Sequence, residues 1–343
     1  MIVLYTFAFL VCFVLLARIV DLYFISSLDK ISKDLKLSSD AAGATLMAVG
    51  SSAPELFVAL FAVLKPGDHQ LIGIGSIVGS AIFNLLVIIG AVALVRNAKL
   101  TWQPAVRDIL FYTLAVVLLV WFIWDGTFTF WEALVFLAVY IVYVYAVVKW
   151  RKILPYSDED FNEHVHDGLN KNKGFIGLID RFISVFLPSR ERYYLTFFVS
   201  ILLIAALSYV LVEVAVVTAE ILNIPEAIIA LTVLAAGTSI PDLFSSIIVA
   251  KQGRGDMAVS NAIGSNIFDI LVGLGLPFVI AIAVYGIPIS SGGDLKMSSI
   301  ILFLSLIILV ILLLVSRWKI GKPAGFILLG LYLFYIGREI YFM

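Results

Sequence analysis

Charged side chains are scarce in this sequence. Only 14% of its 343 residues are Asp, Glu, Lys or Arg, whereas a soluble domain averages about 25%. The one cysteine, Cys12, excludes an internal disulfide. The net charge of −1 points to no class of partner, and the absence of a basic patch gives no reason to expect nucleic acid.

Long apolar runs are present instead, and 62% of the residues are hydrophobic. Runs of about 20 apolar residues are long enough to cross the ~30 Å hydrocarbon core as helices. They lack the alternation of apolar and polar residues that is typical of membrane β-strands. The sequence therefore predicts an all-α polytopic membrane protein. We expect ten transmembrane helices, at about 2–28, 38–65, 69–95, 103–124, 128–150, 191–222, 225–252, 256–284, 295–316 and 322–341.

One polar segment, 151–190, divides the spans and is too short for a folded regulatory domain. Within it, the stretch FIGLIDRFISVFL at 175–187 predicts an amphipathic helix at the membrane interface. If the N-terminus lies outside, nineteen of the 23 Lys and Arg residues fall on the cytoplasmic side and only three outside, Lys65, Lys296 and Arg338. This asymmetry predicts a cytoplasmic linker at 151–190 and both termini on the extracellular side of the cell membrane.

Two strings in the first half of the chain recur in the second half. GSSAPELF from Gly50 corresponds to GTSIPDLF from Gly237, at a shift of 187 residues. GSAIFNLLVIIG from Gly79 corresponds to GSNIFDILVGLG from Gly264, at a shift of 185, with seven of twelve positions identical. Each half has five spans, an odd number, so the second copy enters the membrane from the opposite side, as in many secondary transporters. We expect two inverted five-helix repeats, 1–150 with its motif region at 43–90 and 191–343 with its motif region at 230–275.

Each of the four motif helices presents oxygen ligands on one face. Residues at i and i+4 share a face of a helix, and a hydroxyl stands at this spacing before a carboxylate or amide in Ser51 and Glu55, Thr238 and Asp242, Ser80 and Asn84, and Ser265 and Asp269. Pro54 and Pro241 cannot donate a backbone hydrogen bond, which frees the carbonyls of Gly50 and Gly237. Broken backbone at membrane depth is tolerated where it is buried in protein or lines a cavity. We therefore expect broken helices at the membrane midplane.

These ligands are all oxygens, since the three histidines, His69, His164 and His166, fall in loops. Oxygen ligands suit hard cations such as Ca²⁺, whereas thiolate or imidazole would indicate zinc or copper. A charged side chain at the membrane centre costs ~2.5–3.5 kcal/mol or more, and passing cations are a reason to keep three of them. The remaining charges in or near the spans are expected at interfaces or in pairs within the bundle: Arg18, Asp21, Asp108, Glu132, Glu213 and Glu220.

The paired motifs resemble those of a known family. GSSAPE with GSAIFN, and GTSIPD with GSNIFD, resemble the two α-repeats of the Ca²⁺/cation antiporter superfamily, and the string from Gly237 to Gly275 closely resembles the potassium-dependent sodium/calcium exchangers. The Gly-Asn-x-x-Glu pattern of proton/calcium exchangers is absent. The resemblance implies that Glu55 and Asp242 are central ligands shared by Ca²⁺ and Na⁺. It also implies oxygens from Ser51, Ser52, Thr238 and Ser239, from the backbone near Ala48 and Ala235, and from Asn84 and Asp269, with Ser80 and Ser265 behind them.

The resemblance also bears on potassium. In the potassium-dependent branch, the aspartate that matches Asp269 is tied to potassium use. Glu55, Asp242 and Asp269 together carry −3 when ionised, which Ca²⁺ and K⁺ together balance; an exchanger that protonates Asp269 instead would need no K⁺. The chain departs from the pattern at Ser51, where many relatives have threonine, and at Ala81, which corresponds to Asn266 of the other repeat.

The expected function is secondary active antiport of Na⁺ against Ca²⁺, with K⁺ carried alongside Ca²⁺. We expect alternating access, in which spans 2, 3, 7 and 8 form a packed core and spans 1 and 6 move across it. A K⁺-independent exchanger and an H⁺/Ca²⁺ exchanger remain alternatives. A cation channel is disfavoured because binding by several carboxylates slows ion exit, and an intramembrane hydrolase lacks a nucleophile. We expect no enzymatic activity and no cofactor, and as partners only the lipid bilayer and the transported cations, with no protein partner implied.

Overall fold

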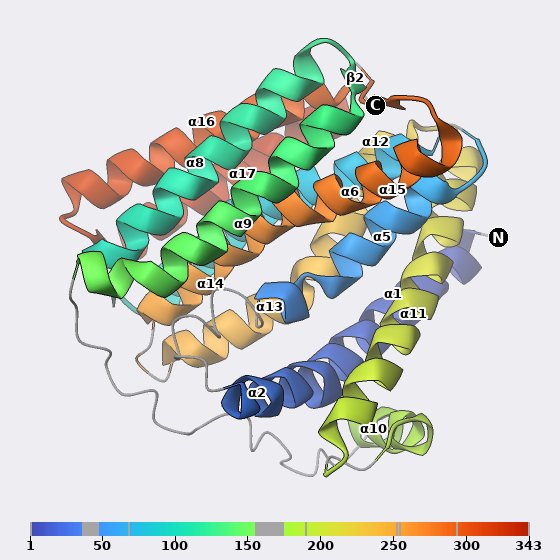
Figure 1. Ribbon diagram of the computed structural model, residues 1–343, viewed down its shortest axis with the longest axis horizontal. Coiled ribbons are helices and arrows are strands. Elements are labelled where there is room, and N and C mark those ends of the chain that lie inside the picture. Colours follow the sequence, from blue (N-terminus) through green and yellow to red (C-terminus); the bar gives the residue numbers. More distant parts are fainter. Residues whose placement is uncertain are drawn as a thin grey trace.

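The computed structural model describes residues 2–35, 48–67, 69–154, 175–188, 191–251, 253, 255–292 and 294–341. This part of the chain is almost entirely helical (Figure 1). The helices of the first half are α1 (Ile2–Ile19), η1 (Val20–Phe24), α2 (Ile25–Asp34), α4 (Ala48–Ser51), α5 (Ala53–Leu64), α6 (Gln70–Phe83), η3 (Asn84–Ile88), α7 (Ile89–Val95), α8 (Trp102–Trp124) and α9 (Phe130–Ile153). Those of the second half are α10 (Phe175–Phe186), α11 (Tyr193–Leu222), α12 (Glu226–Ile229), η4 (Ala230–Leu234), α13 (Ala235–Lys251), α14 (Gly255–Phe268), η5 (Asp269–Leu274), α15 (Gly275–Tyr285), α16 (Asp294–Val315) and α17 (Lys322–Tyr341). The segments labelled η are single π-helical turns within longer helices.

Among the described residues, nine helices are long and apolar enough to cross a membrane. They agree with nine of the ten predicted spans to within a few residues. The other predicted span, 38–65, is described from Ala48 onward, where α4 and α5 form it, and its residues 38–47 lie outside the described part. The chain is a multi-pass membrane protein, as predicted.

Two short sheets relate the halves of the chain. Strand β1 (Ala98–Lys99) pairs with β4 (Lys319–Ile320), and β2 (Thr127–Phe128) pairs with β3 (Ile289–Ser290), both antiparallel. Adding 191 to the residue numbers of β1 gives β3, and adding 192 to those of β2 gives β4. The registers correspond as well, since Ala98 lies opposite Ile320 and Phe128 opposite Ile289. Each sheet therefore joins one strand from each half, as an inverted repeat requires.

The buried apolar side chains of the described residues form two clusters. The larger one fills the space between α6, α8, α9, α14, α15 and α16. The smaller one joins α1 and α11 to each other, to α10 and to one side of α5. Figure 1 shows α1 and α11 side by side along one flank of the bundle. The first and sixth spans thus pack mainly on a separate apolar surface.

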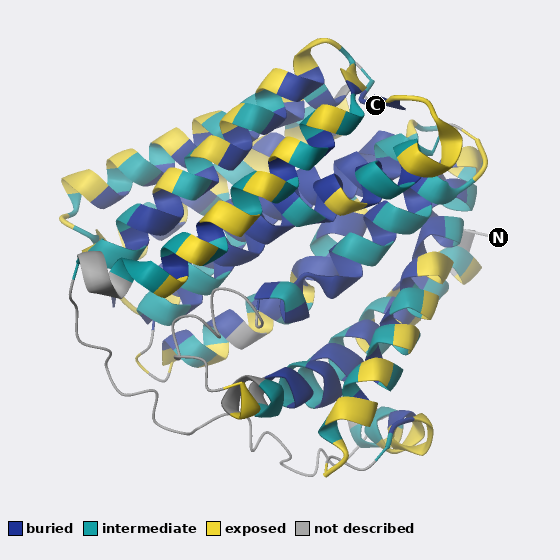
Figure 2. Ribbon diagram, viewed as in Figure 1, coloured by how far each residue is buried: buried dark blue, intermediate teal, exposed yellow. Residues whose placement is uncertain are grey.

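Burial separates the central helices from the peripheral ones (Figure 2). In the most apolar stretch of Gln70–Val95, 83% of the residues are buried, compared with 22% in Phe130–Trp150 and in Lys322–Tyr341. The third span is therefore enclosed by protein, whereas only about a fifth of the residues in the fifth and tenth spans are buried. An exposed apolar surface of this kind is what lipid-facing helices require.

The helix interruptions differ partly from those predicted. In the second span, the helix breaks at Ser52, whose φ of −92° and ψ of 8° separate α4 from α5. In the seventh span, Pro241 lies inside the continuous helix α13, and the irregular turn is η4, upstream of it. The break expected at Pro241 is thus displaced toward the N-terminus. A π-turn inserts one extra residue into the helix. The irregular backbone of this span therefore lies at η4, and the helix continues regularly through Pro241.

Charges outside the motifs form pairs, as expected for several of them. Arg18 of α1 makes two hydrogen bonds of 2.7 Å to Asp180 of α10. The side chain of Arg107 donates to Asp108 at 2.8 Å inside the bundle. The predicted amphipathic segment forms helix α10, and its place at the membrane interface stays a prediction. Its Ile183 is buried while its Phe182 is exposed.

Candidate cation site

The four motif helices meet in the middle of the bundle. All twelve predicted site residues are buried, and the most exposed of them, Asp242, retains 8% of its surface. Asn84 is the first residue of the π-turn η3 and Asp269 the first residue of η5, so the two repeats carry the same distortion at the same motif position. Single π-turns inside α-helices occur frequently at functional sites. The shared distortion marks these two side chains as a matched pair.

Hydroxyls from the opposite repeat bind two of the predicted acids. The Ser239 hydroxyl donates to Glu55 Oε1 at 3.5 Å, and the Thr238 side chain lies beside the same carboxylate. The Ser52 hydroxyl hydrogen-bonds Asp269 in the same crossed manner. Because every one of these contacts joins one repeat to the other, the predicted ligands lie at the interface between the repeats.

The serines at the start of each motif also meet across this interface. The hydroxyls of Ser51 and Ser265 are 3.1 Å apart and hydrogen-bonded. Ser51 is also 3.4 Å from the carbonyl of Ala48, which in addition accepts from the Ser52 amide at 3.0 Å. Ala235 presents its carbonyl to the Thr238 hydroxyl at 3.3 Å. The two backbone positions implied by the resemblance are therefore next to the predicted side-chain ligands.

Two of the predicted residues contribute less directly. The Ser80 hydroxyl donates to the carbonyl of Ile77 in its own helix, at 3.0 Å. Asp242 is close enough to Glu55 for their charges to interact. Among the described residues, however, no group of three carboxylate, imidazole or thiol side chains is placed to hold one metal ion. In this arrangement an ion held by one carboxylate would take most of its ligands from hydroxyl, amide and carbonyl oxygens.

An amide network extends the site beyond the predicted residues. The Asn84 side-chain amide donates to Asn266 Oδ1 at 3.0 Å. Asn266 Nδ2 in turn donates to the Ala81 carbonyl at 3.0 Å and to the Tyr112 hydroxyl at 2.9 Å. Asn266 was visible in the sequence only as a departure from the repeat, and no pattern pointed to Tyr112. Both side chains are completely buried.

Three predicted ligands each keep one oxygen without a partner. Glu55 Oε2, Asn84 Oδ1 and Asp269 Oδ1 are buried and accept no hydrogen bond. A buried acceptor without a donor costs about 1–3 kcal/mol, and more when it is charged. The other buried side-chain atoms without a partner in the described part are hydroxyl oxygens, those of Tyr140, Ser299 and Tyr335. Among the residues that the structure describes, buried carboxylate and amide oxygens without a partner thus occur only on the predicted ligands.

Small residues let the helices around the site approach closely. A Cβ at Gly79 of α6 would lie 2.5 Å from the Leu231 carbonyl oxygen in η4. At Gly237 of α13 it would lie 2.1 Å from the ring of Phe13 in α1. Glycine is therefore needed at Gly79 for close backbone packing, as in other membrane bundles, whereas Gly237 leaves room for the Phe13 ring. The Ser208 hydroxyl of α11 also donates to the Pro54 carbonyl at 3.4 Å, so α1 and α11 contact the seventh and the second span, respectively.

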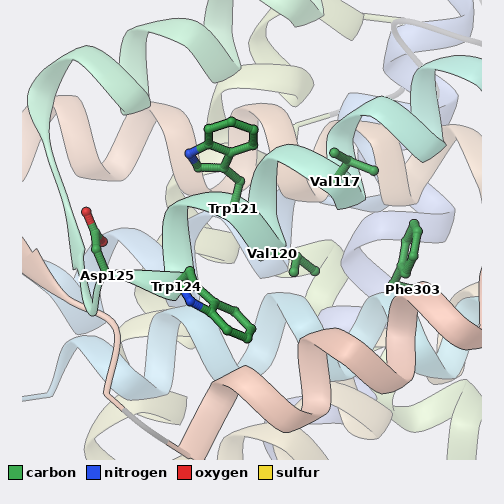
Figure 3. A pocket seen from close by; sticks show the side chains of 6 residues that line it. All are labelled: Val117, Val120, Trp121, Trp124, Asp125 and Phe303. Atoms are coloured by element: carbon green, nitrogen blue, oxygen red, sulfur yellow. The ribbon is translucent and has the colours of Figure 1, made fainter.

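One apolar pocket lies away from this site, at the end of α8 that adjoins β2 (Figure 3). It is lined by Val117, Val120, Trp121, Trp124, Asp125 and Phe303. Trp121 and Trp124 expose 73% and 65% of their surface, and Asp125 is the only charged side chain in the lining. The pocket therefore belongs to the outer surface of the bundle and has none of the oxygen ligands described above.

Comparison with known proteins identifies relatives along nearly the whole chain. Residues 4–149 and 192–340 match the family model described as "Sodium/calcium exchanger protein". The human "Sodium/potassium/calcium exchanger 5" is 32% identical, covering 97% of this chain and 82% of its own length. The human "Sodium/potassium/calcium exchanger 2" is 28% identical, covering 98% and 77%.

A solved structure is similar over the same extent. The sodium-calcium exchanger NCX_Mj, soaked with 2.5 mM Na⁺ and 0.1 mM Sr²⁺, superposes with a TM-score of 0.63 at 26% identity, covering 98% of this chain and 99% of that one. This likeness confirms the predicted fold class, an all-helical membrane bundle of ten spans with inverted repeats.

Proposed function

The chain belongs to the sodium/calcium exchanger family, and on that basis we propose that it exchanges Na⁺ for Ca²⁺ across the membrane, with K⁺ carried alongside Ca²⁺. It is a transporter of cations and not an enzyme. The exchange is driven by ion gradients and needs no ATP, and Na⁺ and Ca²⁺ occupy one set of oxygens at the interface between the repeats.

The observation that carries this proposal is the set of unpartnered oxygens on Glu55, Asn84 and Asp269. Each is an acceptor, each is buried, and together they come from both repeats. Bound cations are the partners that such acceptors lack, and the Glu55 and Asp269 carboxylates are close enough for their charges to interact. Oxygen ligands of mixed type match the adaptable coordination of Ca²⁺, at ~6–8 ligands.

Roles follow from the contacts of each residue. We assign Glu55 and Asp242 as the carboxylates that Ca²⁺ and Na⁺ share. The hydroxyls beside the acids and the nearby backbone carbonyls complete the coordination, and they come from Ser51, Ser52, Thr238, Ser239, Ser265, Ala48 and Ala235. Ser80, which bonds its own helix, supports Asn84 from behind.

Alternating access is supported by the separate packing of α1 and α11. These helices share an apolar cluster with each other and with one side of α5, and they contact the seventh span at Gly237 and the second span at Pro54. Movement of the pair against the core opens the site to one side and then to the other. The core helices α5, α6, α13 and α14 stay together because glycine contacts and crossed hydrogen bonds hold them.

The potassium part of the proposal rests on charge and on the relatives. Glu55, Asp242 and Asp269 carry −3 when all are ionised, and Ca²⁺ with K⁺ neutralises them. The curated relatives are named sodium/potassium/calcium exchangers. We assign K⁺ coupling to Asp269, whose position in the repeat corresponds to the neutral Asn84.

We further propose extracellular termini, a cytoplasmic segment at 151–190, and the division into repeats at 1–150 and 191–343.

The decisive experiment is Ca²⁺ uptake into proteoliposomes loaded with Na⁺, with and without external K⁺. We expect uptake to require the outward Na⁺ gradient and to fall when K⁺ is removed. Uptake that needs Na⁺ but ignores K⁺ would leave a K⁺-independent exchanger. Uptake driven by a proton gradient would replace Na⁺ with H⁺, and flux without a counter-ion would indicate a channel.

Two variants assign the residues. Asp242→Asn should abolish Na⁺-driven uptake, and Asp269→Asn should weaken the response to K⁺ more than the affinity for Ca²⁺. Glu339→Gln is the matched control, because it neutralises a buried carboxylate of α17 that is bonded to Ser298 and Arg338 instead. Normal transport by Asp242→Asn would remove this residue from the site.

A further inference from the structure

The orientation of the Asn266 side chain is determined by its surroundings. Its amide group has two different ends, a nitrogen that only donates and an oxygen that only accepts. The Ala81 carbonyl, 3.0 Å from Asn266 Nδ2, can only accept. The amide nitrogen must therefore face Ala81 and Tyr112, and Asn266 Oδ1 must point to the other side.

This orientation is passed on to Asn84. Asn266 Oδ1 can only accept, so the group 3.0 Å away from it must be the amide nitrogen of Asn84. The Asn84 oxygen is then turned away from Asn266, and it is one of the buried oxygens without a partner. Building on the function proposed above, we propose that Asn266 and Tyr112 are positioning residues, which hold the Asn84 amide with its oxygen, and not its nitrogen, toward the transported cation.

The need for such a relay follows from the chemistry of the two matched positions. An amide that rotates by half a turn replaces an oxygen ligand with two N–H groups, which repel a cation. A carboxylate presents oxygen in either orientation. Asp269 therefore needs no relay, and the residue that would supply one by symmetry is Ala81, which has no polar side chain. The repeats thus differ at two matched positions together: Asn266 stands where the first repeat has Ala81, and Asn84 stands where the second repeat has Asp269.

Tyr112 is the outer member of this relay. Its side chain is completely buried in α8, outside the four motif helices, and its hydroxyl accepts the second N–H of Asn266. Without it, the amide nitrogen of Asn266 donates only to the Ala81 carbonyl, while Asn266 Oδ1 keeps its bond from Asn84. The bond to Tyr112 therefore restricts rotation of Asn266 without touching the site itself.

The test compares single-atom changes at two tyrosines whose hydroxyls are buried. Tyr112→Phe removes the acceptor of the relay, while Tyr140→Phe removes a buried hydroxyl that has no partner and is the matched control. We expect Tyr112→Phe to raise the Ca²⁺ concentration for half-maximal Na⁺-driven uptake by about two- to tenfold, the effect of one neutral hydrogen bond. Maximal rate should stay within about twofold, and Tyr140→Phe should leave both values unchanged.

A second variant tests the order of the relay. Asn266→Ala frees the Asn84 amide entirely and should raise the half-maximal Ca²⁺ concentration at least as much as Tyr112→Phe. Because Tyr112 acts only through Asn266, the double variant should be no worse than Asn266→Ala alone. Full additivity of the two effects would show independent action and would overturn the relay. Unchanged Ca²⁺ and Na⁺ dependence in Tyr112→Phe, or an equal effect in Tyr140→Phe, would overturn it as well.

Cation-induced thermal stabilisation separates this inference from the proposed function. If the parent protein shows no Na⁺-driven uptake, the exchange proposal fails, and the relay is then judged by the stabilisation that Ca²⁺, Na⁺ or K⁺ alone gives to each variant. Smaller stabilisation in Tyr112→Phe than in Tyr140→Phe supports the relay, and equal stabilisation contradicts it. Should Asn266→Ala fail to fold, this comparison of the two tyrosine variants decides alone.

Discussion

The two glycines that begin the second motif, Gly79 and Gly264, should respond in opposite ways to alanine. They are equivalent in the sequence, where GSAIF corresponds to GSNIF. In the structure a Cβ at Gly79 would lie 2.5 Å from the Leu231 oxygen, 2.8 Å from Leu231 Cα and 2.7 Å from Ala235 Cβ. A Cβ at Gly264 meets no heavy atom of the described residues within 4 Å.

The magnitude follows from which atoms would have to move. Two of the three atoms facing Gly79 belong to the backbone of η4, so no side-chain rotation relieves the contact. Overpacking a filled core costs typically ~1–3 kcal/mol. Replacing glycine by alanine inside a helix returns about 1 kcal/mol in both variants, and this gain cancels in the comparison. We therefore expect the free energy of unfolding of Gly79→Ala to lie ~1–3 kcal/mol below that of Gly264→Ala.

The assay is thermal stability of the purified protein in detergent, followed by retention of the monodisperse fraction after heating. For soluble domains of 150–250 residues, one kcal/mol corresponds to a shift of about 2–4 °C, so a difference of several degrees is expected. Gly330→Ala in α17, where an added Cβ also meets nothing within 4 Å, reports the helix gain alone. Equal melting of Gly79→Ala and Gly264→Ala would refute the close contact between α6 and η4.

Three further predictions concern the helices around the core. Glu213→Gln removes the ion pair with Lys65, which joins α11 to the end of α5. We expect the maximal rate of Ca²⁺ uptake to change at least about twofold, while the half-maximal Ca²⁺ concentration stays the same. An unaltered rate would argue against a link between these helices during transport. Arg18→Met removes both bonds to Asp180, so amide hydrogen exchange in α10 should accelerate while that of α9 does not; equal protection in the variant and parent would contradict this attachment. Cys12, the only cysteine, lies on α1 and its side chain is buried against the neighbouring helices. In the folded protein its thiol should therefore react with a membrane-permeant maleimide at least about tenfold more slowly than in the denatured protein. Fast labelling of the folded protein would contradict that packing.

The sequence was sufficient to predict the class of protein, the number of spans, the repeat and the family. Apolar runs of membrane length are a property of composition, and they need no tertiary information. The resemblance drawn from the paired motifs around Glu55 and Asp242 is confirmed by the family match along both halves of the chain. The candidate ligands were also visible in advance, because a hydroxyl and an acid four residues apart share one helix face whatever that helix packs against.

The break in the seventh span shows where local reasoning stopped. Pro241 removes one hydrogen bond, and the expected consequence was a break beside it. The structure instead has a continuous helix through Pro241 and a π-turn at Ala230–Leu234. That turn is the segment against which Gly79 of α6 lies. The position of the irregularity therefore depends on packing between helices that are distant in the sequence.

Tertiary structure alone decided which matched residues remain equivalent. Gly79 and Gly264 have the same neighbours along the chain, yet only Gly79 lies against another backbone in the described part. Tyr112 belongs to neither motif, and its role depends on a hydroxyl placed 2.9 Å from Asn266. A repeat in the sequence shows which residue types recur, because it gives the order of side chains along each helix. The helix that faces each residue, and therefore the contact that its side chain makes, is specified only when the two halves pack together.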